Sequence, residues 1–223
     1  NGLIRYNLGY SQFKQEEYTE AISNFQKYVA NNASTDAQRK NDANLRIADA
    51  YFIEGDNWKA MQYYNKVISN NKEDVDYASY QKALCYGLVR KNKTKIEVLS
   101  QFETKFPNSK YRDDAYFQLA STLSNMGRYQ ESIENFNKLI SKFPNSQYQT
   151  KSYLKKGLAE YNSNQNQEAI TSLKTLVENF PNSQESAQAV KNLEQIYIDL
   201  GQISEYAKWV KKYDFIDYSE NDL

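Results

Sequence analysis

The sequence predicts an all-α solenoid of about six helix–turn–helix repeats, and three observations lead to this prediction. The three prolines, Pro107, Pro144 and Pro181, all lie in the tetrapeptide Phe-Pro-Asn-Ser, at intervals of 37 residues. Between these tetrapeptides, apolar residues recur at helical spacing in two separate blocks. In several units a glycine separates the two blocks. Self-similarity at a fixed period of this length is typical of stacked helical repeats.

The repeats fill the chain from end to end. A small or semi-apolar residue in the second half of each unit recurs at steps of 39, 35, 37, 37 and 37, at Ala21, Ala60, Lys95, Ser132, Ala169 and Tyr206. We therefore expect residues 1–223 to form one solenoid, and we expect it to be an excised part of a longer repeat protein. The predicted repeats span residues 3–36, 41–74, 76–109, 112–146, 149–183 and 186–216.

The fourth repeat illustrates how each unit is built. Its apolar residues follow i, i+3, i+4, i+7 over residues 116–123 and i, i+3, i+6, i+7 over residues 133–140, which predicts two amphipathic helices. Gly127 lies between them, where a left-handed backbone can end the first helix. Phe-Pro-Asn-Ser at residues 143–146 ends the second helix, because the residue before a proline is excluded from the α region. The Asn or Ser of this motif can then cap the next helix.

This pattern resembles the tetratricopeptide repeat over nearly all of residues 3–213. The third repeat departs from the family with Arg90 in place of Gly and Lys95 in place of Ala, and the sixth departs at Glu194 and Tyr206. The resemblance implies a right-handed superhelix whose first helices line the concave side, and a non-catalytic scaffold that binds a protein or peptide. The fourth repeat matches the family pattern at Tyr116, Leu119, Ala120, Leu123, Gly127, Tyr129, Ser132, Phe136, Leu139 and Pro144.

The repeat is longer than the family's usual length of about 34 residues. The longer form is similar to the repeats of bacterial envelope proteins, such as outer-membrane assembly lipoproteins and the periplasmic partner of the Tol system. This likeness implies a periplasmic or outer-membrane-associated protein, and a cytoplasmic location stays open.

The resemblance also implies which residues face the concave groove. Among the carried-over positions are Leu45 and Asp49 in the second repeat and Leu154 in the fifth. Aromatic anchors suit the binding of a peptide, because they bury a large area with few rotatable bonds. The alternative is that these rings pack against one another or against a neighbouring part of a longer chain. The expected partner-binding residues are Tyr6, Tyr10, Phe13, Phe52, Tyr77, Tyr80, Phe117 and Tyr161.

Composition excludes several other classes of function. The chain holds 28 Lys+Arg and 28 Asp+Glu, which leaves no broad basic surface for nucleic acid or for an anionic membrane. Without histidine, no catalytic triad that uses His can form, and one cysteine cannot build a zinc cluster. We therefore expect no enzyme activity, no metal and no cofactor. No run is long and apolar enough for insertion into a membrane.

Four local features have plain structural interpretations. Cys85 lies on an apolar helix face and is expected to be a small core residue. Asp113 and Asp114 are expected at a helix start, where the helix dipole favours negative charge. Lys91, Lys93 and Lys95, together with Arg90, are expected to form a solvated basic turn, and the acidic residues Asp214, Asp217, Glu220 and Asp222 a solvated tail.

The ends of the predicted solenoid lack polar caps. The last helix carries Trp209, Val210 and Tyr213, followed by Phe215, Ile216 and Tyr218, and an exposed apolar end favours self-association. Two alternatives to a binding scaffold stay open. One is a structural spacer or assembly segment of a longer envelope protein. The other is a glycan-binding module, since aromatic grooves also stack sugars.

Overall fold

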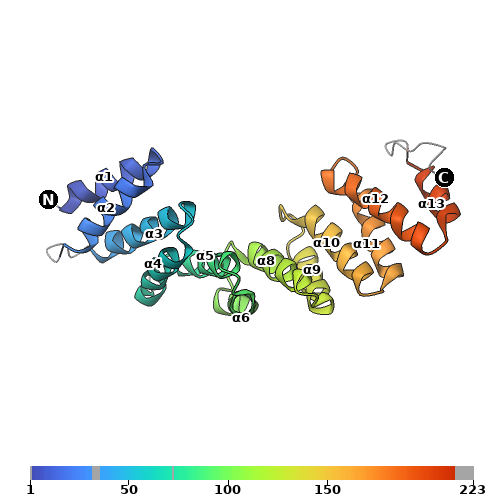
Figure 1. The fold of residues 1–223 in the computed structure, drawn as a ribbon, viewed down its shortest axis with the longest axis horizontal. Helices are drawn as coiled ribbons and strands as arrows, with labels where there is room; N and C mark the ends of the chain where they lie inside the picture. Colours follow the sequence, from blue (N-terminus) through green and yellow to red (C-terminus); the bar gives the residue numbers. More distant parts are fainter. Residues whose placement is uncertain (1, 32–35, 72, 214–223) are drawn as a thin grey trace. The chain divides into compact units, whose positions relative to one another are not determined.

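The computed structural model describes residues 2–31, 36–71 and 73–213, and over these residues the chain forms thirteen helices and no strand (Figure 1). This confirms the all-α prediction. The chain divides into two compact units, residues 1–112 and 113–223. The single-solenoid organisation and its place in a longer protein stay predictions. The acidic tail and the apolar residues Phe215, Ile216 and Tyr218 lie outside the described residues.

In the first unit, successive helices pack side by side as pairs. The third pair differs from the others, because its second half is divided into two short helices. The helices are α1 (Gly2–Lys14), α2 (Tyr18–Val29), α3 (Ala37–Ile53), α4 (Asn57–Asn70), α5 (Val75–Leu88), α6 (Asn92–Ser100) and α7 (Phe102–Lys105).

In the second unit, all three pairs have an undivided second helix. The last pair buries Tyr206, Trp209 and Val210 in a core cluster with residues of α11. The helices are α8 (Arg112–Asn125), α9 (Tyr129–Lys142), α10 (Gln149–Asn162), α11 (Asn166–Asn179), α12 (Gln184–Asp199) and α13 (Ile203–Val210).

The predicted glycine turns are confirmed. Gly55, Gly127 and Gly201 have φ values of +83°, +73° and +68°, each directly after a first helix. Nothing lies within 4 Å of a Cβ placed on any of them, so the backbone conformation alone requires glycine. At the matching turn of the third pair, Arg90 adopts φ +61°.

The Phe-Pro-Asn-Ser motifs end the second helices as expected, but the expected capping of the next helix is correct at only one of them. Ser183 is the N-cap of α12, and its side chain accepts a hydrogen bond from the backbone N–H of Ser186. Ser109 and Ser146 instead accept from the N–H groups of Tyr111 and Tyr148, two residues further on. These two serines stabilise a turn, and α8 and α10 begin later.

Lys95 is buried, whereas it was expected to belong to a solvated basic turn. Its side chain is 9% exposed, and a Cβ on Gly87 would lie 3.0 Å from Lys95 Cδ. The bare backbone at Gly87 therefore leaves room for the aliphatic stem of Lys95 where the repeat normally has an alanine. Burial lowers the pKa of the Lys95 ammonium. Lys91 and Lys93 are exposed, as predicted.

The apolar C-terminal helix also differs from expectation. Trp209 is 6% exposed and Val210 is fully buried, so both belong to the core. The Trp209 indole N–H donates to Glu178 of α11 at 3.4 Å. At the other end of the chain, α1 does expose apolar residues, with Leu3, Ile4 and Leu8 48%, 60% and 43% exposed.

Cys85 is a core residue, as predicted, and its thiol is expected to be unreactive. The side chain is fully buried in α5, and burial raises the pKa of the thiol to about 12. We expect a neutral alkylating reagent to modify Cys85 only when the first unit unfolds. Labelling followed by mass spectrometry, with and without denaturant, checks this. Rapid labelling of the folded chain would contradict it.

Candidate functional site

The first helices of neighbouring pairs lie against each other within each unit. α1 contacts α3, and α10 contacts α12, whereas the second helices of these pairs make no comparable contact over the described residues. In each unit, two neighbouring first helices therefore share a face, α1 and α3 in the first unit and α10 and α12 in the second. We call this shared face the first-helix face.

Tyrosine hydroxyl groups link neighbouring first helices. Tyr6 of α1 donates to Asp42 of α3 at 2.7 Å, and Tyr77 of α5 donates to Asp49 of α3 at 3.1 Å. Burial and the nearby carboxylates raise the pKa of both phenols. Both residues were predicted to bind a partner, but their hydroxyl groups are already engaged within the chain. Only the rings remain for other contacts.

The second unit repeats this arrangement. Tyr161 of α10 donates to Asp199 of α12. The hydrogen bond raises the pKa of Tyr161 and lowers that of Asp199. At the start of the unit, Tyr148 donates to Asp114 of α8 at 2.7 Å. Asp113 and Asp114 occupy the first turn of α8, where they were expected.

Two of the predicted anchors are almost completely buried. Tyr80 is 7% exposed and stacks on Tyr111 with ring centroids 5.8 Å apart. Phe117 is 9% exposed and stacks on Tyr148 at 4.4 Å. These rings pack in the interior behind the first-helix face and offer little surface to a partner.

The remaining three predicted aromatics keep more accessible surface. Tyr10 is 37% exposed, and the Lys14 ammonium lies 5.7 Å from its ring centroid. Phe13 and Phe52 are half-buried and pack against core clusters of the first unit.

Leu45 and Asp49 do not line a groove, which corrects their predicted placement. Leu45 is 2% exposed and Asp49 is 7% exposed. The Asp49 carboxylate accepts from the hydroxyl groups of Tyr64 at 2.8 Å and Tyr77, and it lies 3.3 Å from Arg46. Burial raises the pKa of Asp49 despite these partners.

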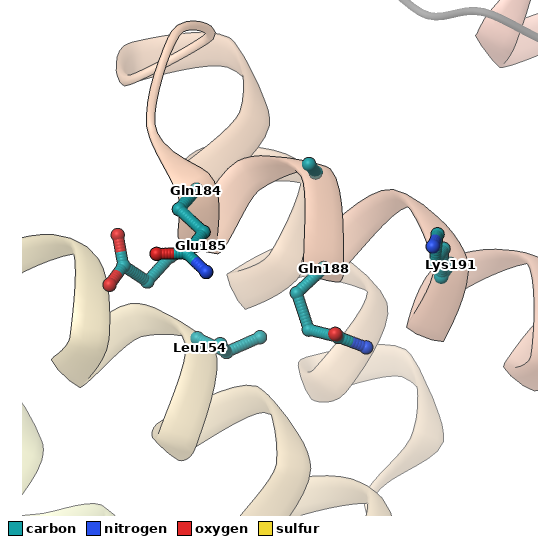
Figure 2. Close-up of a pocket in the computed structure, with 6 residues that line it drawn as sticks. Leu154, Gln184, Glu185, Gln188 and Lys191 are labelled. Atoms are coloured by element: carbon teal, nitrogen blue, oxygen red, sulfur yellow. The ribbon is translucent and has the colours of Figure 1, made fainter.

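A pocket of about 420 Å³ lies on the first-helix face of the second unit, between α10 and α12 (Figure 2). Leu154 of α10 is a predicted groove position and lies opposite Gln188 of α12 in this view. Gln184 and Gln188 have amide groups that can donate and accept hydrogen bonds. Glu185 and Lys191 add one charge of each sign. The pocket is lined by Leu154, Gln184, Glu185, Ala187, Gln188 and Lys191.

Sequence reasoning missed the α12 side of this pocket. Gln184, Gln188 and Lys191 follow i, i+4, i+7, so they share one face of the helix. This polar stripe on the first helix of the sixth repeat could have indicated a binding surface from the sequence. It was missed because only aromatic residues were considered as anchors.

A second hollow, of about 360 Å³, lies in the first unit, and four of its eight lining residues are acidic. Asp36 is paired with Arg39 at 2.8 Å, and Glu73 accepts from Gln38 at 2.9 Å. Its lining residues are Tyr6, Asp36, Gln38, Arg39, Asn41, Asp42, Glu73 and Asp74. Over the described residues, no group of three or more Cys, Asp or Glu side chains is arranged to hold a metal ion.

The paired helices, glycine turns and adjacent first helices define a tetratricopeptide-type helical repeat protein. A family model described as an outer membrane lipoprotein, YfiO, matches residues 4–163, and the chain therefore belongs to this family. A tetratricopeptide-repeat model matches residues 151–183. Among curated proteins, no sequence matches this chain.

Solved structures show the same fold at low sequence identity. A crystal structure of the MamA protein is 19% identical with a TM-score of 0.65, and the alignment covers 79% of this chain and 90% of MamA. MamA from Desulfovibrio magneticus RS-1, from residue 41 to its end, is 15% identical with a TM-score of 0.63, over 77% and 92% of the two chains. The TPR-like repeats of a putative kinesin light chain from Podosopora anserina are 16% identical with a TM-score of 0.59, over 77% and 91%.

Helical repeats of this type are typical of protein–protein interaction scaffolds. Within the described part of the chain, no helix is both long and apolar enough to span a bilayer.

Proposed function

We propose that this protein is a non-catalytic scaffold that binds an extended segment of a partner protein along its first-helix face. The observation that carries the proposal is the pocket between α10 and α12, where one apolar side chain and two amides converge. Leu154 offers an apolar contact, and Gln184 and Gln188 can bond to the backbone of an extended peptide, which has a free donor and acceptor at every residue.

The charges of the pocket favour one direction of the bound segment. Glu185 and Lys191 lie six residues apart on α12, or about 9 Å along the helix axis. An extended peptide covers this distance in about three residues. A partner segment with a basic residue near Glu185 and an acidic residue near Lys191 fits this arrangement.

In the first unit, we propose that the accessible rings of Tyr10, Phe13 and Phe52 contact the partner. Tyr6, Tyr77 and Tyr161 offer ring surface while their hydroxyl groups hold neighbouring first helices together. Tyr80 and Phe117 contribute by supporting the same surface. The family's description as an outer membrane lipoprotein supports an association with the bacterial envelope.

Loss of the α12 side chains is expected to abolish capture of the partner. We propose the variant Gln184→Ala/Gln188→Ala/Lys191→Ala of the chain of residues 1–223, with circular dichroism to establish that it stays helical. The matched control removes two neutral polar residues and one lysine from second helices, as Gln167→Ala/Thr171→Ala/Lys138→Ala. The readout is a quantitative pull-down from envelope and cytosolic extracts of the native host.

A protein enriched by the native chain and the control, and reduced at least about tenfold with the pocket variant, supports the proposal. Equal enrichment by all three chains contradicts it. A native chain that enriches no protein in either extract would favour the structural-spacer alternative.

A further inference from the structure

An apolar patch with a basic border lies on the first unit, at the turns that join first and second helices. Ile53 ends α3 and is 53% exposed, Trp58 is the second residue of α4 and is 54% exposed, and Leu88 ends α5 and is 60% exposed. The Lys91 ammonium lies 4.8 Å from the centroid of the Trp58 ring, so the two turns are neighbours. We call Ile53, Trp58 and Leu88, together with Arg90, Lys91 and Lys93, the turn-edge patch.

The patch carries net positive charge. Arg90, Lys91 and Lys93 are exposed, and none of them forms an ion pair with a described residue. Three carboxylates lie near the patch in the sequence, and Glu97, one turn after Lys93 on α6, partly offsets the charge of Lys93. Asp56 is paired with Lys59 at 2.6 Å, and Glu54 accepts from Thr19 at 2.9 Å. A ligand that complements this surface must combine apolar side chains with negative charge.

One segment of this chain has that composition. Residues 214–223 read Asp-Phe-Ile-Asp-Tyr-Ser-Glu-Asn-Asp-Leu, with four acidic residues, no basic residue and four large apolar or aromatic ones. We propose that residues 214–223 of one copy bind the turn-edge patch of a second copy. The segment follows the second unit and the patch belongs to the first, so the contact joins two copies head to tail.

The chemistry predicts a weak, salt-sensitive association. A segment of ten residues buries much less surface than a stable interface needs. Its acidic side chains meet cations that are exposed to solvent, where added salt screens the attraction. The Trp58 ring would become less exposed in the contact, so its emission should shift to shorter wavelength as association proceeds.

The test uses chains of residues 1–223 that carry Trp209→Phe, because Trp58 is then the only tryptophan in this sequence. The patch-reversed variant is Arg90→Glu/Lys91→Glu/Lys93→Glu, and the tail-reversed variant is Asp214→Lys/Asp217→Lys/Glu220→Lys/Asp222→Lys. Sedimentation velocity and Trp58 emission are followed over a wide range of protein concentration. Lys91→Gln/Lys93→Gln is a milder patch variant that leaves the left-handed Arg90 unchanged.

We expect the parent chain to associate as concentration rises, with a matching blue shift of Trp58. Each reversed variant alone should associate at least about tenfold more weakly. A mixture of the two reversed variants should associate again, because the acidic patch of one then meets the basic tail of the other.

Four results would overturn the proposal. If the shift of Trp58 emission requires the native residues 214–223 but does not depend on protein concentration, the patch binds residues 214–223 of its own chain. A shift seen only with phosphatidylglycerol vesicles, and unchanged by tail reversal, would assign it to a membrane surface. Association that persists in both reversed variants, or no association at all, would exclude the contact.

Discussion

Replacing Asp49 with alanine is expected to destabilise the first unit by about 3 kcal/mol. The carboxylate is 7% exposed and accepts the hydroxyl group of Tyr64, which is itself fully buried. Alanine leaves this hydroxyl group without an acceptor inside the core, and it leaves Arg46 with only Asp42 as an ion-pair partner. The measurement is denaturant-induced exposure of Cys85 to alkylation, which reports on the first unit alone.

Two further variants separate the causes of this loss. Asp49→Asn keeps an acceptor for Tyr64 and Tyr77, so it should cost clearly less than alanine. The Asp49→Ala/Tyr64→Phe double variant has no hydroxyl group left without an acceptor. Its loss of unfolding free energy should therefore be smaller than the sum of the losses of the two single variants. A loss below about 1 kcal/mol for Asp49→Ala, the value of an exposed ion pair, would contradict this account.

Asp49 also gives the first unit a dependence on pH. Because the pKa of Asp49 is raised in the folded state, the Asp49 carboxyl group stays protonated to a higher pH in the folded chain than in the unfolded chain. The contribution of Asp49 therefore favours folding at acidic pH and declines as pH rises from about 4 through the raised pKa. Asp49→Asn should remove this component of the pH profile.

Gly157→Val is expected to destabilise the second unit by about 2–3 kcal/mol. A Cβ on Gly157 would lie 2.7 Å from Leu173 Cγ and 2.8 Å from Leu173 Cδ2, and Leu173 is fully buried between α10 and its neighbours. Neither side chain could move away without disturbing the core cluster of α11 and α12. Unfolding is followed by Trp209 fluorescence in a Trp58→Phe background.

The matched control is Lys151→Val, an exposed position of the same helix, where valine lowers helix propensity without any clash. It should cost about 0.5 kcal/mol. Adding Leu173→Ala to Gly157→Val should recover part of the lost stability, because the smaller residue makes room. Equal losses in Gly157→Val and Lys151→Val would show that steric contact at Gly157 is unimportant.

The periodic signals in the sequence were sufficient to predict the helices and their glycine turns, except for the division of the third repeat's second helix into α6 and α7. Gly55, Gly127 and Gly201 marked the ends of first helices because a left-handed backbone is accessible to glycine at little cost. The prolines marked the ends of second helices. Lys95 could not be predicted from its own position, because its burial depends on Gly87 of the preceding helix.

The candidate site was predicted less well, and the hydroxyl groups of its tyrosines explain why. Aromatic residues at groove positions were read as contacts for a partner, whereas Tyr6 and Tyr161 bond to acidic residues about one repeat further along. Asp42 follows Tyr6 by 36 residues and Asp199 follows Tyr161 by 38. A search for complementary polar pairs at the repeat period would have found both links. The stripe of Gln184, Gln188 and Lys191 required attention to polar residues as well.

Site-specific photo-crosslinking tests the central claim most directly. A photoreactive phenylalanine analogue replaces Gln188 in the pocket between α10 and α12, or Thr171 on α11 as the control, in the protein produced in its native host. The account predicts a discrete crosslinked protein from position 188 that is absent from position 171 and lost when Gln184 and Lys191 are also changed to alanine. Crosslinks of equal yield from both positions, or crosslinks from position 171 alone, would contradict binding on the first-helix face.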